Sequence, residues 1–191
     1  MTIGILAVQG AFIEHESILN NMGVDCIELR QKADVLQPYD ALILPGGEST
    51  VQGKLLKELD MFDTIKEQIE SGMPVLGTCA GMILLAEHIS NDERGHIGTL
   101  PVTVKRNAYG RQLGSFHTIE EFDGLGKIPM TFIRAPYIES VEPGVQVLAK
   151  VDDNIVAVQY KNQIALSFHP ELDTDTSIYN MFLDMIKGQS H

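Results

Sequence analysis

The sequence predicts an α/β fold with three layers, built on a mostly parallel central sheet to which antiparallel strands are added. Three observations predict it. Short apolar runs alternate four times with amphipathic stretches in the first half of the chain. Several of these runs are apolar at almost every position, as in strands buried on both faces of a parallel sheet. The second half carries short strand-like runs separated by turn residues, which predict antiparallel hairpins in the sheet or beside it.

The elements of the first half follow from local patterns. Ile3 to Val8 is almost wholly apolar and stops at Gln9-Gly10, which predicts the first strand. The next stretch, 12–22, has apolar residues near helical spacing and ends at Gly23, which predicts a helix. The same reasoning predicts strands over 24–29, 41–44 and 74–76, and helices over about 50–59, 61–71 and 82–87.

The second half is predicted to be rich in strands. Turn signals such as Asp152-Asp153-Asn154 and Lys161-Asn162 separate the runs, and a last amphipathic helix is predicted over about 175–187. No stretch has the composition of a linker, so we expect one domain over residues 1–191. The predicted strands cover residues 102–105, 114–118, 131–134, 145–150, 155–160 and 164–168.

Composition excludes several functional classes. The chain has 191 residues and a formal net charge of −12, so nucleic acid is not an expected partner. Two cysteines imply no disulfide framework and favour a cytoplasmic protein with reduced thiols. Neither a signal peptide nor a membrane span is expected, because no basic N-terminal region and no long apolar window occurs. Paired Cys or His spacings are missing, so no metal is expected.

One candidate nucleophile lies in Gly77-Thr78-Cys79-Ala80-Gly81, between a predicted strand and a predicted helix. A G-x-C-x-G sequence in this place has the form of a nucleophile elbow, in which small residues let the backbone turn sharply. The helix that follows favours the thiolate, which is the reactive form of cysteine. The alternative is a buried structural cysteine in a tight turn. Cys26, in an apolar strand pattern, is expected in the core.

A candidate base ends the apolar run 164–168, in His169-Pro170-Glu171. Proline drives the preceding residue into an extended conformation, and residues i and i+2 of an extended segment project to the same side. Glu171 can therefore turn toward the imidazole of His169, fix its tautomer and stabilise its protonated form. An ordinary turn would explain the tripeptide by itself, but its combination with the cysteine elbow favours a catalytic triad.

The other histidines are weaker candidates for the base. His15 and His88 lie among glutamates in amphipathic stretches, so we expect them on solvated helix faces. His96 lies in a charged, glycine-rich loop, and His117 on a predicted strand stays an open alternative.

A third motif, Pro45-Gly46-Gly47-Glu48-Ser49-Thr50, also follows a predicted strand. Two glycines let the backbone approach a ligand closely, and N–H groups at a helix start can hold an anion or an oxyanion. Capping of the helix by Ser49 or Thr50 is the other interpretation, and both can hold together. Because two glycines turn at little steric cost, we expect that a partner can reorient this peptide.

The three motifs, in this order, resemble the class I, triad-type glutamine amidotransferases. Finer matches are similar to one of their families, the glutaminase subunits of pyridoxal 5′-phosphate synthase. The matching stretches are LAVQGAFIEH (6–15), PGGEST (45–50), GTCAGMILLA (77–86), RNAYGRQ (106–112), TFIRAP (131–136) and SFHPEL (167–172). The chain departs from the family's pattern at Asp173, where a threonine is expected.

The resemblance implies a flavodoxin-like, class I amidotransferase fold and a glutaminase activity. In that reading Cys79 attacks the side-chain amide of L-glutamine, His169 acts as base and then as acid, and Glu171 orients His169. A γ-glutamyl thioester forms, and water hydrolyses it to glutamate. The oxyanion hole is implied at Gly47 and Ala80. Substrate contacts are implied for Gly47, Glu48, Ser49, Arg106, Ile133 and Arg134.

The resemblance also implies a partner, because released ammonia is consumed by another subunit. That subunit is a (β/α)8-barrel pyridoxal 5′-phosphate synthase in a large hetero-oligomeric complex, with Gln9-Gly10 at the interface. The glutaminase itself is expected to carry no cofactor. Two alternatives stay open: a stand-alone cysteine hydrolase of related fold, such as a DJ-1/PfpI-type protein or a gamma-glutamyl hydrolase, and a non-catalytic subunit whose elbow is a relic.

Overall fold

The computed structural model describes residues 1–90, 92, 95–106 and 115–189. In the first half, strands and helices alternate, as the apolar runs predicted. These elements are β1 (Thr2–Leu6), α1 (Phe12–Asn21), β2 (Asp25–Leu29), α2 (Lys32–Val35), β3 (Ala41–Leu44), α3 (Ser49–Glu58), α4 (Phe62–Glu70), β4 (Val75–Thr78), α5 (Ala80–Leu85) and β5 (Ala86–Ile89).

The second half consists mainly of strands and closes with a short 3-10 turn and a helix. These elements are β6 (Leu100–Lys105), β7 (Ser115–Phe122), β8 (Gly126–Ile133), β9 (Tyr137–Val141), β10 (Gln146–Val151), β11 (Asn154–Tyr160), β12 (Gln163–Leu166), η2 (Pro170–Leu172) and α6 (Ser177–Gly188). Among the described residues, none of the helices has both the length and the apolar character needed to cross a membrane.

Within the described residues, ten strands form one sheet in the order β2-β1-β3-β4-β12-β11-β9-β6-β5, with β10 paired to β11. The strands from β2 to β12 in this order are parallel neighbours. Antiparallel pairs join β12, β11, β9 and β6, and β7 pairs with β8 in a separate hairpin. The predicted α/β class, with antiparallel strands added to the sheet and beside it, is confirmed.

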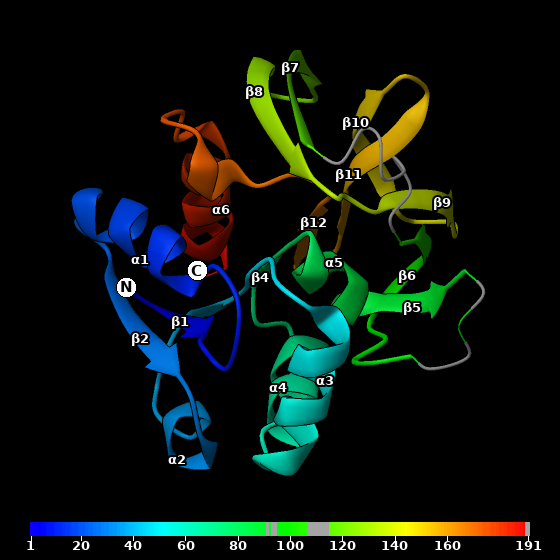
Figure 1. The fold of residues 1–191 in the computed structure, drawn as a ribbon. Helices are drawn as coiled ribbons and strands as arrows, with labels where there is room; N and C mark the ends of the chain where they lie inside the picture. Colours follow the sequence, from blue (N-terminus) through cyan, green and yellow to red (C-terminus); the bar gives the residue numbers. More distant parts are fainter. Residues whose placement is uncertain (91, 93–94, 107–114, 190–191) are drawn as a thin grey trace.

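Side chains of the central strands point alternately to two cores, which makes the fold a three-layer one. Along β3, Ala41 and Ile43 pack in one core together with side chains of α1 and α6. Leu42 and Leu44 pack in the other core, with side chains of α3, α4 and α5. Figure 1 shows α1 and α6 beside one another, while the β7–β8 hairpin stands out at the top of the view.

Three neighbouring parallel strands bring the three sequence motifs together. Leu44 of β3 lies opposite Gly77 of β4, and Thr78 of β4 lies opposite Leu166 of β12. The residues that follow each strand therefore meet at one edge of the sheet. In open α/β sheets, sites form beyond the carboxyl ends of the strands, and this edge is that place.

The ends of several elements differ from the prediction. The helix predicted over 82–87 runs over 80–85 instead, because Ala86 is extended and begins β5, which pairs with β6. The short helix α2 was not predicted, since a single turn shows no helical period. A capping box between Gln31 and Asp34 fixes its start.

Several strands of the second half also differ from the prediction. β8 begins at Gly126, five residues before the predicted strand over 131–134. β9 was not predicted, because exposed Glu139 interrupts its apolar pattern. β7 continues to Phe122, four residues beyond the predicted strand, whose first residue, Gly114, lies outside the described residues.

Candidate active site

Cys79 lies in the sharp turn between β4 and α5, so the strand–turn–helix setting predicted for it is present. Its φ of 52° is a left-handed conformation that residues with a side chain rarely adopt. The N–H of Cys79 donates a 2.8 Å hydrogen bond to the carbonyl of Leu166, which ties the turn to β12. A Cβ on Gly81 would collide with the carbonyl oxygen of Leu44, so the close packing of α5 on β3 requires glycine there.

His169 and Glu171 are joined directly. The backbone of His169 is extended, and Glu171 lies in the 3-10 turn that Pro170 begins. Nδ1 of His169 is 2.5 Å from Oε1 of Glu171, and both residues are buried. The N–H of His169 also donates to the carbonyl of Thr131 on β8, at 2.9 Å. The imidazole is therefore fixed both through its ring and through its backbone.

The same imidazole also interacts with the side chain of Cys79, and this interaction affects the charge of the site. Burial lowers the pKa of His169, but its interactions with Cys79 and Glu171 outweigh burial and raise the pKa to about 10. Burial raises the pKa of Glu171, whereas its hydrogen bond to His169 and the nearby ring of His15 lower it, with a net shift downward. The geometry thus favours an imidazolium held between a sulfur and a carboxylate.

The glycine pair after β3 approaches this imidazole closely. A Cβ on Gly46 would collide with Cε1 of His169. The carbonyl of Gly46 accepts a 2.9 Å hydrogen bond from the N–H of Ala11, so it points toward the start of α1. In a trans peptide the N–H points the opposite way, and the N–H of Gly47 is therefore turned away from Ala11. The side chain of Gln9 fixes the next peptide, accepting from the N–H of Glu48 at 2.8 Å.

A cavity of about 520 Å³ opens over these residues. The sequence-predicted site residues line it, except Glu171, which lies behind His169. The lining includes Gly47, Glu48, Ser49, Cys79, Ala80, Arg106, Ile133, Arg134 and His169. Segments from both halves of the chain thus meet around the sulfur.

The chain is similar to known proteins in both sequence and fold. Residues 5–188 match the model of the SNO glutamine amidotransferase family. The chain belongs to this family. A solved structure described as a glutamine amidotransferase superposes with a TM-score of 0.92 and 42% identity, over 97% of this chain and 98% of the other. PurLQS from Thermotoga maritima is 17% identical with a TM-score of 0.71, over 100% of this chain and 98% of that one, and supports the fold alone.

Curated relatives in the family carry the name pyridoxal 5′-phosphate synthase subunit PdxT. The relative from Desulfitobacterium hafniense (strain DSM 10664 / DCB-2) is 66% identical over 188 residues, which are 98% of this chain and 94% of the relative. The relative from Streptococcus pneumoniae (strain 70585) is 54% identical over 193 residues, covering all of both chains.

Arg106 connects the glycine loop to the rim of the cavity. Its guanidinium donates to the hydroxyls of Ser49, at 2.5 Å, and Thr50, at 3.1 Å, and lies 3.7 Å from a carboxylate oxygen of Asp92. Its Nε is buried and has no hydrogen-bond partner among the described residues. Residues 107–112, which complete the RNAYGRQ stretch, lie outside the described part of the chain.

His15 is the residue that sequence reasoning placed wrongly. It was expected on a solvated helix face, but it is fully buried. Its Nε2 lies 3.5 Å from Oε2 of Glu171, and its Nδ1 lies 2.8 Å from the hydroxyl of Tyr179. A signal was available, because His15 lies four residues before the buried Leu19 on α1, a spacing that puts both on one face.

The remaining histidines lie away from the sulfur. His88 is exposed, as expected, although it lies on β5 and not on a helix. His117, the alternative base, contacts Asp173 at 3.3 Å and does not line the cavity. His96 borders a different hollow beside α3.

Cys26 differs from Cys79 in every respect that matters for reactivity. It is half-buried on β2 and packs against the core that contains α1. Burial, with the nearby carboxylates of Glu16 and Asp25, raises the pKa of Cys26 to about 11. Within the described ranges, no cluster of three or more His, Cys, Asp or Glu side chains could hold a metal ion.

Proposed function

We propose that this chain is a glutaminase that hydrolyses L-glutamine to L-glutamate and ammonia as a subunit of pyridoxal 5′-phosphate synthase. The relatives that match along the whole chain carry the name of that subunit. The observation that carries the proposal is that Cys79 and His169 line one wall of the cavity and interact there, while Glu171 is hydrogen-bonded to the other side of the imidazole. We assign the activity to residues 1–191 as one glutaminase domain.

The first step forms a covalent intermediate. Sγ of Cys79 attacks the side-chain amide carbon of glutamine, and a tetrahedral intermediate with a negative oxygen results. The protonated imidazole of His169 then gives its proton to the amide nitrogen. The carbon–nitrogen bond breaks, ammonia leaves, and a γ-glutamyl thioester remains on Cys79. Glu171 keeps Nδ1 of His169 occupied, so that Nε2 faces the sulfur.

Two backbone N–H groups are suited to the negative oxygen. The N–H of Ala80 directly follows the sulfur-bearing residue at the start of α5. The N–H of Gly47 is turned away from Ala11, on a peptide that lines the same cavity. Donors of this kind lower the barrier because they are already oriented when the charge develops.

Substrate binding uses groups of both charges, as an amino acid requires. Glu48 can hold the α-amino group of glutamine, and Arg106 and Arg134 can hold its carboxylate. Ser49 and the apolar side chain of Ile133 complete the pocket around the aliphatic part of the substrate.

The second step releases glutamate. His169 is neutral after the first step, because its proton has left with the ammonia, and the esterified sulfur has no negative charge that would raise the pKa of His169 again. Neutral His169 then accepts a proton from water as the water oxygen attacks the thioester carbonyl. Glutamate leaves and Cys79 is regenerated. These steps use only side chains, backbone N–H groups and water.

Delivery of ammonia explains the need for a partner. Ammonia that escapes to water at neutral pH becomes mostly ammonium, which is not a nucleophile. We therefore propose that a (β/α)8-barrel synthase subunit docks in a large hetero-oligomeric complex in the cytoplasm. Gln9-Gly10 is proposed at that interface, and the contact of Gln9 with Glu48 links it to the loop that carries Gly47. Docking would thereby affect the oxyanion site.

The test is glutamate release from glutamine by the chain alone and with its synthase subunit. We expect activity to rise at least about tenfold with the synthase and to fall more than about 1,000-fold in Cys79→Ala. The same synthase preparation with Cys79→Ala is the control for contaminating glutaminase. Strong activity unaffected by the synthase would indicate a stand-alone hydrolase, and inactivity in both cases would indicate a non-catalytic subunit.

A further inference from the structure

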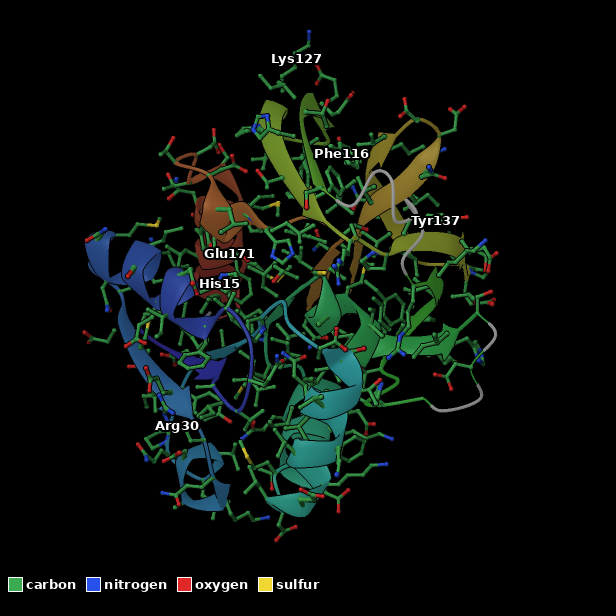
Figure 2. The ribbon with its side chains drawn as sticks, viewed as in Figure 1. His15, Arg30, Phe116, Lys127, Tyr137 and Glu171 are labelled. Carbon is green, nitrogen blue, oxygen red and sulfur yellow. The ribbon has the colours of Figure 1, made fainter. Side chains whose placement is uncertain are left out.

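His15 is a fully buried, ionisable residue that the steps proposed above do not use. Glu171 has a histidine at each carboxylate oxygen. His169 lies 2.5 Å from Oε1, and Nε2 of His15 lies 3.5 Å from Oε2. Figure 2 shows His15 and Glu171 next to each other, where α1 meets the turn after β12.

The second oxygen of Glu171 needs a donor. Oε2 is buried and has no hydrogen-bond partner within the described part of the chain. A buried carboxylate oxygen without a donor is unfavourable, and it leaves the carboxylate free to rotate away from His169. At 3.5 Å, His15 makes a close electrostatic contact with this oxygen. Contacts of this kind are often long in a free enzyme and shorten when substrate is bound.

Tyr179 decides which nitrogen of His15 carries the proton. A neutral imidazole has one donor and one acceptor nitrogen. The hydroxyl of Tyr179, on α6, lies 2.8 Å from Nδ1 and can donate to it. The proton of His15 is then on Nε2, which faces Glu171 and lies 3.4 Å from the hydroxyl of Thr78. The opposite tautomer would turn a lone pair toward the carboxylate.

The protonation states agree with this assignment. Burial lowers the pKa of His15, although Glu171 opposes that shift, so the ring is neutral. Burial and the charge of Glu171 raise the pKa of Tyr179, so its hydroxyl keeps the proton that it donates. The ion pair of the network is therefore formed by Glu171 and His169, and His15 contributes a neutral donor.

We propose that His15 is a positioning residue, which holds the second carboxylate oxygen of Glu171 in the tautomer that Tyr179 fixes. The inference rests on the glutaminase function proposed above and adds a fourth and a fifth side chain to it. Three elements that are distant in sequence, namely α1, the turn after β12, and α6, thereby fix the orientation of the base. Glu171 then keeps its full effect on the imidazole.

Loss of the contact between His15 and Glu171 has a predictable effect on the pH dependence of kcat/KM. Glu171 raises the pKa of His169, so a displaced Glu171 lets that pKa fall. The imidazolium of His169 gives its proton to the leaving nitrogen. The alkaline limb of the plot of kcat/KM against pH reports the deprotonation of this imidazolium. That limb must therefore move to lower pH. The other ionisable groups near His15 and Glu171 are Cys79, Tyr179 and Glu14.

A matched pair of variants at position 15 tests the proposal, assayed with the synthase subunit. His15→Asn places an amide near Nδ1 and keeps a partner for Tyr179, but it leaves nothing at Nε2. His15→Gln places an amide near Nε2, where it can donate to Glu171. We expect His15→Asn to lower kcat about 10- to 100-fold, with KM within about twofold, and to move the alkaline limb down by about half a pH unit or more. His15→Gln should stay within about fivefold of the parent, with its limb unmoved.

A second pair keeps the test decisive if His15→Asn does not fold. Tyr179→Phe removes only the hydroxyl that orients His15, and it should move the limb in the same direction. Tyr39→Phe is its control, because it removes another buried hydroxyl, bonded to Gln68, in the opposite core. It should leave kcat and the limb unchanged.

Each outcome has a defined meaning. A fall in kcat in both position-15 variants with an unmoved limb would show a merely structural role and overturn the proposal. Parent-like kinetics in His15→Asn, or in Tyr179→Phe where the former does not fold, would also overturn it. Both results leave the glutaminase function standing if the parent is active and Cys79→Ala is not. An inactive parent would overturn the function and this inference together.

Discussion

Two regions border the cavity and contribute different groups to it. One consists of the carboxyl ends of β3, β4 and β12, and the other is the β7–β8 hairpin. The strand ends carry the sulfur, the imidazole and the glycine pair, all on backbone held by parallel neighbours. The hairpin forms its own small sheet and has exposed side chains along β7. It supplies Ile133 and Arg134 to the rim, and the carbonyl of Thr131 to the N–H of His169. The reactive groups thus directly follow strands of the large sheet, whereas the hairpin holds the backbone of His169 and contributes to the rim of the cavity.

The largest expected effect comes from disturbing the packing of the strand ends. Gly81→Ala would drive a methyl group into the Leu44 carbonyl, a contact with backbone that no side-chain rotation relieves. We expect a loss of about 3 kcal/mol or more in the free energy of unfolding, measured by urea denaturation, and loss of glutaminase activity.

Gly188→Ala is the matched control, because a Cβ at that position meets nothing within 4 Å. It lies at the end of α6 and should change stability by less than about 1 kcal/mol. Equal stability of the two alanine variants would show that the turn at Cys79 is not held by close packing.

A second test compares two thiols within the parallel half. Solvent accessibility favours alkylation of half-buried Cys26 over that of Cys79, which is 8% exposed. Chemistry favours the reverse, because His169 can stabilise a thiolate at Cys79, whereas the pKa of Cys26 is raised to about 11.

We expect iodoacetamide at pH 7 to modify Cys79 at least about 100 times faster than Cys26, as followed by peptide mass spectrometry. Glutamine, which we propose to bind in the cavity that Cys79 lines, should protect Cys79 and leave Cys26 unaffected. Comparable rates at the two positions would contradict an activated sulfur.

The difference between the strand ends and the rest of the molecule also explains which structural features could be predicted from the sequence. The strand ends were predictable because each motif follows an apolar run directly, and parallel strands align their carboxyl ends at one edge. The contacts of His15 were not predictable, since its partners Tyr179 and Glu171 lie more than 150 residues away along the chain. Neither was β9, whose pairing with β6 and β11 compensates for a weak local pattern.

Asp173 is another residue whose contacts could not be predicted from the sequence. In the sequence it was only a departure from the family's pattern. In the structure its carboxylate accepts a 3.0 Å hydrogen bond from the hydroxyl of Thr131 and contacts His117 at 3.3 Å. It therefore ties the segment after Glu171 to the hairpin, a function that no local spacing indicates.

The smallest expected effect comes from loosening this tie. Thr131→Val keeps the shape of the side chain and removes the hydroxyl that Asp173 accepts from, while the backbone bond to His169 remains. We expect a loss of about 1 kcal/mol in stability and a two- to fivefold fall in kcat, because the turn carrying Glu171 gains freedom. Thr118→Val is the control on the same hairpin, since the hydroxyl of Thr118 donates to nearby Glu120. If both variants lower kcat equally, the hairpin acts through its general stability. If Thr131→Val alone lowers kcat, the hairpin acts on catalysis through the segment that holds Glu171.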